Sequence, residues 1–495
     1  MNLVMLVSDT FRWDYLGAYG NDWIETPNLD RLAAESVIYT QAFGEGLPTI
    51  QARRVIMTGR PIFPFRYRPQ LGDSVQLHGW HPLYDEDVTM AEHLQSQGFV
   101  TCMVTDVYHM MKPGKNFHRG FACWHWIRGQ ESDAFALRDP KRVAEIAARL
   151  PASADPKRVP WIIQHLVNRA QWQSDADTYV GQVMRRAADW IRDYTLEAPF
   201  FIYVDCFDPH EPWDPPLEDG QRYKPDFNGI DGILPAWELA RLSDEEFANA
   251  KAAYAGEATL TDRWIGHVLQ ALREAGHYDD TLIIFTSDHG SMMGEQGEVH
   301  KREDRLRNQV TQVPLFIRHP AGDGAGRTVD AFVQHQDLAP TALALLGIEP
   351  HERMTGANVW IFRGQDNEKS AALPKRAPKS CPRKIPERDA IVIGFGHFAS
   401  VRTRQWNYIT PWTELPEARQ PRHELYDLEA DPQELTNVID QHADVAQRLR
   451  QHLRDHMAAM APATEGRFQA EAPDAARMSL DGFPIHRAPS GEGYV

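Results

Sequence analysis

The sequence MNLVMLVSDTFRWD, residues 1–14, places an uninterrupted apolar run at residues 3–7 directly before a cluster of charged side chains. An apolar run of this length without polar alternation is typical of a strand that is buried on both faces of a parallel sheet. Ligands of open α/β sheets bind beyond the carboxyl ends of such strands. The stretch therefore predicts a central strand that ends at a functional residue, Asp9.

The same pattern recurs along the chain and alternates with helical periodicity. Further buried strands are predicted at residues 100–104, 200–204, 282–286 and 315–318. Helical patterns lie at residues 27–35, 178–194, 245–275 and 337–346. This alternation predicts an α/β fold in which helices sandwich a mixed, mostly parallel sheet.

The pattern changes after residue 366. Residues 367–389 are rich in Lys, Arg and Pro and lack periodicity, so we expect a linker or edge loop there. Short strands at residues 390–393 and 399–409 and a helix at residues 440–460 follow. The chain is therefore predicted to contain a catalytic α/β domain at residues 1–366 and a small α+β C-terminal subdomain with a tail at residues 390–495.

The composition disfavours several classes of partner. The chain has 495 residues and a net charge of −17, which disfavours a broad basic surface for nucleic acid but allows a local cationic pocket. No apolar run reaches the roughly 18 residues of a membrane span, and the first residues lack a basic signal-peptide region. The cysteines, Cys102, Cys123, Cys206 and Cys381, show no CxxC spacing. These features predict a cytoplasmic protein without membrane or nucleic-acid partners.

Polar side chains follow two of the predicted strands. Asp9 follows the strand at residues 3–7, and Asp288 and His289 follow the strand at residues 282–286. Carboxylate and imidazole ligands together suit Mn²⁺, Mg²⁺, Ca²⁺ or Zn²⁺. An aspartate in this position also serves as a helix cap, but two acidic strand ends and an adjacent histidine favour a metal site.

The stretch GLPTIQARRVIMTGR, residues 46–60, predicts a turn into a helix that starts near Thr49 and closes near Gly59. Thr49 has two interpretations, a helix N-cap or a nucleophile, because a helix N-terminus also stabilises an anion. In the second interpretation Arg53, one turn further on, faces the anion or the nucleophile. His210, between two prolines in residues 203–216, is either a structural hydrogen-bonding group or part of the site.

These clusters, in this order, resemble the sulfatases and phosphonate monoester hydrolases of the alkaline phosphatase superfamily. The resemblance covers most of the chain and includes DTFRWDYLGAYG (9–20), TPNLDRLAAE (26–35), VPLFIRHP (313–320), HQDLAPTALALLG (335–347) and ELYDLEADPQELTNV (424–438). It implies helices around a mixed sheet, with a small C-terminal subdomain packed against the edge of that sheet.

The resemblance also implies roles for individual residues. Asp9, Thr49, Asp288 and His289 match the metal ligands of the family, and Thr49 matches the position of its nucleophile. Arg53 matches the arginine that supports the nucleophile, and His210 and Lys301 match the residues that bind the transferred anion and assist the leaving group. His109, in TDVYHMM, is a weaker match to the histidine of the GKWH motif.

The departures from the family pattern determine the predicted reaction. Sulfatases oxidise the cysteine or serine of a CxPxR or SxPxR frame to formylglycine, whereas residues 49–53 read TIQAR, from which no formylglycine forms. A threonine ester must instead be cleared by water, as related enzymes do with phosphate esters of threonine. Thr10, Val107 and Gln296 also replace a second acidic residue, a lysine and a histidine of the family pattern.

We therefore predict a hydrolase of phosphate diesters or phosphonate monoesters that acts on a small anionic ester. One divalent ion is expected, with Mn²⁺ as the first choice and Zn²⁺, Ca²⁺ and Mg²⁺ as alternatives, because the possible ligands of a second ion match the two-metal spacing poorly. Those residues are Asp205, Asp208, His210, His300 and His335. Two alternatives remain open, a sulfate ester hydrolase acting without formylglycine and a noncatalytic metal-binding relative. A homo-oligomer that forms contacts through the C-terminal tail is compatible with both of these alternatives.

Overall fold

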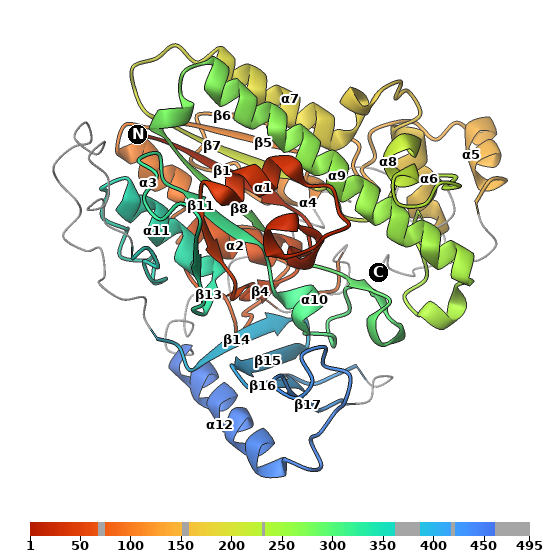
Figure 1. The fold of residues 1–495 in the computed structure, drawn as a ribbon, viewed down its shortest axis with the longest axis vertical. Helices are drawn as coiled ribbons and strands as arrows, with labels where there is room; N and C mark the ends of the chain where they lie inside the picture. The colour runs from red at the N-terminus through yellow and green to blue at the C-terminus, as the bar shows by residue number, and fades with distance from the viewer. Residues whose placement is uncertain (68–74, 151–157, 230–232, 362–386, 417–420, 461–495) are drawn as a thin grey trace.

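The central feature of the computed structural model is an eight-stranded sheet (Figure 1). Its strands lie in the order β12 (Arg327–Val329), β2 (Val37–Tyr39), β11 (Leu315–Arg318), β8 (Thr281–Ser287), β1 (Asn2–Ser8), β7 (Phe200–Cys206), β5 (Val100–Thr105) and β6 (Cys123–Trp126). The pairings are parallel except for those of β11 with β8 and β2. The structure describes residues 1–67, 75–150, 158–229, 233–361, 387–416 and 421–460.

Helices cover both faces of this sheet because alternate residues of β1 point to opposite sides. Val4 and Leu6 enter one core, and Leu3, Met5 and Val7 enter the other. The first core is closed by α1 (Pro27–Ala34), α7 (Tyr179–Arg192) and α9 (Asp244–Glu274). The second is closed by α2 (Thr49–Thr58), α3 (Met90–Ser96) and α11 (Leu338–Leu345). The predicted sandwich of helices around a mostly parallel sheet is therefore confirmed.

A second sheet of five strands lies beside the first domain and carries α12 (Ala443–Met460) on one face (Figure 1). Its order is β17 (Glu424–Asp427), β16 (Trp406–Pro411), β15 (Phe398–Thr403), β14 (Ala390–Phe395) and β4 (Gly46–Leu47). The β4 strand belongs to the N-terminal part of the chain and pairs in parallel with β14. The small C-terminal sheet is thus extended by a strand that stands directly before Thr49.

The remaining elements are short and connect the layers. The short strands are β3 (Ala42–Phe43), β9 (Met292–Met293), β10 (Val299–His300) and β13 (Val333–Gln334). The further helices are α4 (Tyr108–Met111), α5 (Pro140–Ala147), α6 (Val159–Asn168), α8 (Leu217–Gln221) and α10 (Asn308–Thr311). Single 3₁₀ turns lie at Trp13–Tyr15, Gly17–Tyr19, Asp175–Asp177, Leu239–Arg241, Tyr278–Asp280, Glu295–Gly297 and His335–Asp337.

The five predicted strands and four predicted helices of the large domain are present, with ends that differ by a few residues at most. Residues 399–409 divide into β15 and β16, which pair as an antiparallel hairpin. The expected linker at residues 367–389 lies almost wholly outside the described residues, as does the tail from residue 461, so the domain boundaries stay a prediction. Within the described residues, none of the helices is both long and apolar enough to cross a membrane.

Candidate metal centre and catalytic site

The predicted metal ligands come together because two neighbouring strands end at the same level. β1 and β8 pair in parallel with Ser8 opposite Ser287, so the residues that follow, Asp9 and Asp288, leave the sheet side by side. A ligand atom from each of Asp9, Asp288 and His289 lies within 4.8 Å of the other two. All three side chains are completely buried.

The hydrogen bonds of His289 leave one ring nitrogen free to act as a ligand. Its Nδ1 lies 2.9 Å from the Gly290 carbonyl oxygen, which only accepts, so Nδ1 carries the proton. Nε2 then presents a lone pair 3.8 Å from Asp9 Oδ1 and 3.5 Å from Asp288 Oδ2, and it has no hydrogen-bond partner. Ligands of one ion are spaced roughly 3–3.5 Å apart when each bond is about 2.1 Å long. The orphaned nitrogen and the two carboxylates therefore fit a divalent cation.

The charge balance of the site leads to the same conclusion. Arg53 donates to three carboxylates, those of Asp9 (3.0 Å), Asp288 (2.6 Å) and Asp205 (2.8 and 2.9 Å), and all four side chains are fully buried. One guanidinium against three carboxylates leaves negative charge in a place where its desolvation is costly. Burial raises the pKa of Asp205 to about 6, although Arg53 acts in the opposite direction. A bound divalent cation would neutralise this excess.

Thr10 holds the two ligand carboxylates in place. Its backbone N–H donates to Asp288 Oδ1 at 2.9 Å, and its hydroxyl donates to Asp9 Oδ1 at 2.6 Å. The residue has a φ of 60°, which is costly for a β-branched side chain. The backbone carbonyl of Thr10 also accepts a bond from Tyr254 Oη at 2.8 Å, so the conformation is fixed from three sides. Thr10, which replaces the second acidic residue of the family pattern, therefore orients the two carboxylates that are predicted to bind the metal.

Thr49 is the first residue of α2, with Pro48 as the N-cap residue and no side-chain cap hydrogen bond. The helix-cap interpretation of Thr49 is therefore wrong, because the helical backbone already begins at this residue. Arg53 Nη1 lies 3.2 Å from the Thr49 carbonyl oxygen, and the same nitrogen contacts Asp9 and Asp288. Thr49 is consequently next to the metal ligands. Gly59 ends the helix in the left-handed conformation, as predicted.

His210 and Lys301 form a hydrogen-bonded pair in which the donor and the acceptor can be assigned. His210 Nδ1 lies 2.5 Å from the carbonyl oxygen of Glu211, so this nitrogen holds a proton. Lys301 Nζ then donates to His210 Nε2 at 2.6 Å and lies 3.4 Å from the Glu211 carboxylate. Burial lowers the pKa of His289 to about 3, and the charge of the nearby Lys301 contributes in the same direction. The pair therefore lies close to the metal ligands and presents the ammonium of Lys301 as its proton donor.

His109 also lies in this region, although its sequence match is the weakest. Its Nε2 is 2.8 Å from the carboxylate of Glu131, and its Nδ1 is buried without a hydrogen-bond partner. Burial lowers the pKa of His109 well below the ordinary value, and the nearby charges of Lys112, His210 and Asp9 also act on it. His109 is thus an uncharged imidazole on the side of the site that Glu131 and Trp80 enclose.

The structure places the residues that depart from the family pattern and the possible ligands of a second ion. Gln296 donates to the carbonyl of Glu434, and Val107 lies in the apolar core, so neither offers a group to the metal ligands. Asp205 is held by Arg53, and His335 Nε2 lies 2.9 Å from the Ser287 carbonyl. In the described part of the chain, the group formed by Asp9, Asp288 and His289 is the only metal-ligand group that contains carboxylates.

Three acidic residues of the site had no assigned role from sequence. Asp205 was considered only for a second ion, yet it holds Arg53, and Glu211 and Glu131 contact Lys301 and His109. The only sequence signal for these residues was their position relative to a predicted strand. Asp205 and Glu211 follow the predicted strand at residues 200–204, whereas Glu131 lies in a stretch without periodicity.

Comparisons with known proteins show which family the chain resembles. A model of the sulfatase family matches residues 1–348, and a model described as N-sulphoglucosamine sulphohydrolase, C-terminal, matches residues 294–461. The chain is 26% identical over 491 residues to an arylsulfatase of Clostridium perfringens, with 89% of this chain and 90% of that protein covered. It is 22% identical over 486 residues to an N-acetylglucosamine-6-O-sulfatase of Bacteroides thetaiotaomicron, with coverage of 88% and 82%.

Several solved structures resemble this chain in their fold. The phosphonate monoester hydrolase of Agrobacterium radiobacter matches with a TM-score of 0.66 and 22% identity, over 92% of this chain and 96% of that one. A phosphonate monoester hydrolase from Silicibacter pomeroyi matches with a TM-score of 0.63 and 21% identity, over 92% and 95%. The same large sheet and C-terminal β-rich subdomain therefore occur in phosphonate monoester hydrolases.

Proposed function

The chain belongs to the sulfatase family, and from this we propose that it is a metal-dependent hydrolase of phosphate diesters or phosphonate monoesters that uses Thr49 as its nucleophile. The supporting observation is that one nitrogen, Arg53 Nη1, contacts the Thr49 carbonyl and both ligand carboxylates. Thr49, which is the first residue of α2 and carries a hydroxyl, therefore shares a hydrogen-bond donor with the carboxylates of a buried anionic group that fits a metal ion. Metal dependence is general in this family.

The chemistry of threonine is the reason to prefer phosphoryl transfer. Asp9, Asp288 and His289, with the Thr49 hydroxyl, would hold the ion. When bound, the ion polarises the hydroxyl and neutralises charge on the ester oxygens. Thr49 Oγ1 forms a bond to phosphorus while the bond to the leaving oxygen breaks, and the hydroxyl proton passes to solvent. Water then displaces Oγ1 from phosphorus, and Thr49 regains a proton.

The Lys301–His210 pair supplies the proton of the first step. Lys301 donates one N–H to His210 Nε2 and a second, longer bond to the Glu211 carboxylate, so one of its three N–H groups remains for the ester. An ammonium stabilises the negative charge that develops on the leaving oxygen and can transfer a proton to it. His210 positions Lys301, since its own proton is engaged by the Glu211 carbonyl. Arg53 takes no part in proton transfer because its N–H groups already donate to three carboxylates.

A sulfate ester hydrolase that acts without formylglycine is the second candidate. It is favoured by the similarity of the chain to sulfatases, among them the arylsulfatase of Clostridium perfringens. A threonine sulfate ester has no hydrate hydroxyl that could expel sulfate, so its clearance depends entirely on attack by water. We therefore place this activity second.

A matched panel of aryl esters tests the two activities. The panel contains a phosphate diester, a phosphonate monoester, a phosphate monoester and a sulfate monoester of one phenol, each incubated with Mn²⁺-reconstituted protein. We expect kcat/KM to be highest for the diester or the phosphonate. Dominant sulfate hydrolysis would contradict the assignment of phosphoryl transfer and support the second candidate. No turnover of any ester would favour the noncatalytic alternative.

A further inference from the structure

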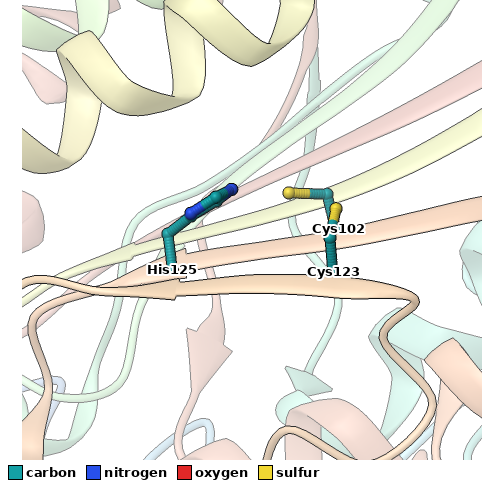
Figure 2. A group of neighbouring side chains, drawn as sticks. All are labelled: Cys102, Cys123 and His125. Atoms are coloured by element: carbon teal, nitrogen blue, oxygen red, sulfur yellow. The ribbon is translucent and has the colours of Figure 1, made fainter.

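A second group of metal-ligating side chains lies on the opposite side of β7 from the catalytic strands. It contains Cys102 on β5 and Cys123 and His125 on the edge strand β6. Each residue offers a ligand atom within 4.8 Å of the other two. Figure 2 shows the three side chains rising from the same face of the two strands, with both sulfur atoms and the imidazole gathered above the sheet.

Strand register produces this group. β5 and β6 pair in parallel with Cys102 opposite Cys123 and Val104 opposite His125. Successive side chains of a strand alternate between faces, so Cys123 and His125, two residues apart, share the face that Cys102 occupies on the neighbouring strand. Cys102 is completely buried, whereas Cys123 and His125 are half-buried at the open edge of the sheet. The positions are therefore fixed by backbone pairing and remain accessible to an ion from one side.

We propose that Cys102, Cys123 and His125 form a second metal site, separate from the catalytic centre, that takes a thiophilic ion such as Zn²⁺. Two sulfurs and one imidazole nitrogen are the donor set that zinc and other soft or borderline ions prefer over Mg²⁺ or Ca²⁺. A tetrahedral zinc site needs ligand atoms roughly 3.5–3.8 Å apart, so small side-chain rotations from the present spacing close it. The open edge of β6 leaves the fourth position to water.

The third residue distinguishes a metal site from a simple pair of cysteines. A disulfide would need only the two sulfurs, and the imidazole would then have no part in the group. On metal binding, both thiols lose their protons to solvent and the imidazole binds in its neutral form, so no oxidant or reductant is needed. Burial and the neighbouring Cys123 raise the pKa of Cys102 well above the ordinary range, which keeps this thiol protonated and unreactive in the absence of an ion.

Arg186 on α7 is the group that competes with the ion. Its Nη2 lies 3.3 Å from His125 Nε2, and a guanidinium only donates, so the neutral imidazole accepts this bond. Arg186 is exposed and is free to move toward solvent. Removing its charge should therefore strengthen metal binding, whereas removing a ligand should abolish or weaken it. These opposite effects from adjacent side chains separate a metal site from an incidental cluster.

The bound ion would tie the edge strand to the body of the sheet through side chains. β6 is the last strand of the eight, and β5 is its only strand neighbour among the residues that the structure describes. The chain leaves β6 at Trp126 and then supplies Glu131, which contacts His109 in the catalytic site. A side-chain link between β5 and β6 therefore steadies the strand from which this loop departs.

Co²⁺ titration of the chelator-treated, full-length protein tests the proposal without reference to enzyme activity. Thiolate ligands give Co²⁺ a charge-transfer absorption that oxygen and nitrogen ligands do not. We expect this absorption to saturate with one ion per chain. Cys123→Ser should abolish it, and His125→Gln should weaken Co²⁺ binding by at least about tenfold. Arg186→Ala should strengthen binding by about two- to fivefold.

Asp288→Asn is the control for the other centre, and it should leave the thiolate absorption unchanged. Far-UV circular dichroism checks that each variant is folded. If Cys123→Ser does not fold, His125→Gln tests the site in its place. The proposal is overturned if no thiolate absorption appears at millimolar Co²⁺ or if the absorption survives Cys123→Ser. It is also overturned if the purified protein carries a Cys102–Cys123 disulfide, seen as a mass lower by two hydrogens, and takes up no ion at this group after reduction.

Discussion

Arg53 and Asp205 form a doubly hydrogen-bonded ion pair at the centre of the protein, with Nε 2.9 Å from Oδ2 and Nη2 2.8 Å from Oδ1. Both side chains are fully buried. Two parallel bonds fix the plane of the guanidinium, and only Nη1 is left to reach the metal ligands and the carbonyl of Thr49. Asp205 thus determines where Arg53 points.

Replacing Arg53 by lysine should destabilise the protein strongly. Lysine keeps the charge but cannot make the paired bonds, so Asp205 and one ligand carboxylate lose a buried partner. We expect the free energy of unfolding to fall by about 3–5 kcal/mol, measured by urea denaturation of the metal-free protein. Arg302→Lys, at a partly exposed arginine, is the matched control and should change stability by less than about 0.5 kcal/mol. Equal effects would mean that the Arg53 network has no special role.

Thr49→Ala should remove activity and leave the fold intact. The hydroxyl is not a helix cap, so its loss should cost little stability, whereas kcat should fall by a factor of at least about 10⁴ if Thr49 is the nucleophile. Thr49→Ser keeps a hydroxyl and should retain substantial activity. Kinetics on the preferred aryl ester, with thermal melting and metal analysis of the same samples, measure both effects. Full activity of Thr49→Ala would show that another group attacks the ester.

Lys301→Met should reduce activity in a way that depends on the leaving group. A proton from the ammonium is needed most when the departing alkoxide is strongly basic. We expect kcat/KM to fall by about 10²–10⁴-fold for an alkyl ester and much less for a nitrophenyl ester of the same acid. The slope of log kcat/KM against the pKa of the leaving group measures this difference. An unchanged slope would assign Lys301 to substrate binding alone.

Glu211→Gln should lower stability in a pH-dependent manner. Burial alone would raise the pKa of Glu211, but the neighbouring His210, Lys301 and His300 outweigh that effect and hold this pKa well below the ordinary value. A carboxyl group with a lowered folded-state pKa stabilises the protein above its unfolded pKa of about 4.3 and loses that contribution as pH falls through the folded pKa. The stability difference between wild type and variant should therefore be full at pH 7 and shrink below about pH 4. Urea unfolding across this range tests the sign, and a difference that grows in acid would contradict it.

Asp288→Asn should have opposite effects with and without metal. In the metal-free protein it removes one of three buried carboxylates, so we expect thermal stability to be unchanged or higher. Wild type should gain about 2.7 kcal/mol from a metal concentration of about 100 times Kd, and the variant should lose most of that gain. Melting curves with Mn²⁺ and with chelator measure both. A variant that is stabilised by Mn²⁺ as much as wild type would exclude Asp288 as a ligand.

The sequence predicted the central strands well because each is a continuous apolar run buried on both faces. It did not predict β2, β12 or β6, which are short and lie toward the edges of the sheet. β6 reads Cys-Trp-His-Trp, and its exposed Trp124 and half-buried His125 give no buried-strand signal. Edge strands are held mainly by pairing with a neighbour, and a hydrophobic pattern does not record that pairing.

The site was predictable where its residues follow a strand directly, and less so where only the tertiary fold joins them. Asp9, Asp288 and His289 belong to the first kind. Glu131 is 22 positions from its partner His109, in a loop without periodicity. Cys102 and Cys123 became neighbours only through the register of β5 and β6, and no CxxC spacing announced them. Long-range pairing therefore carries information that local patterns lack.

The pairing of β4 with β14 makes the segment before Thr49 depend on two distant parts of the chain. Gly46 and Leu47 pair with Gly394 and Phe395, and Thr49 follows after one proline. We therefore expect both parts of the chain to be needed for activity. A fragment ending before residue 387 would contain every residue of the proposed metal centre and still be inactive. Adding the separate piece from residue 387 onward should restore turnover, which makes this junction a natural point for a complementation reporter.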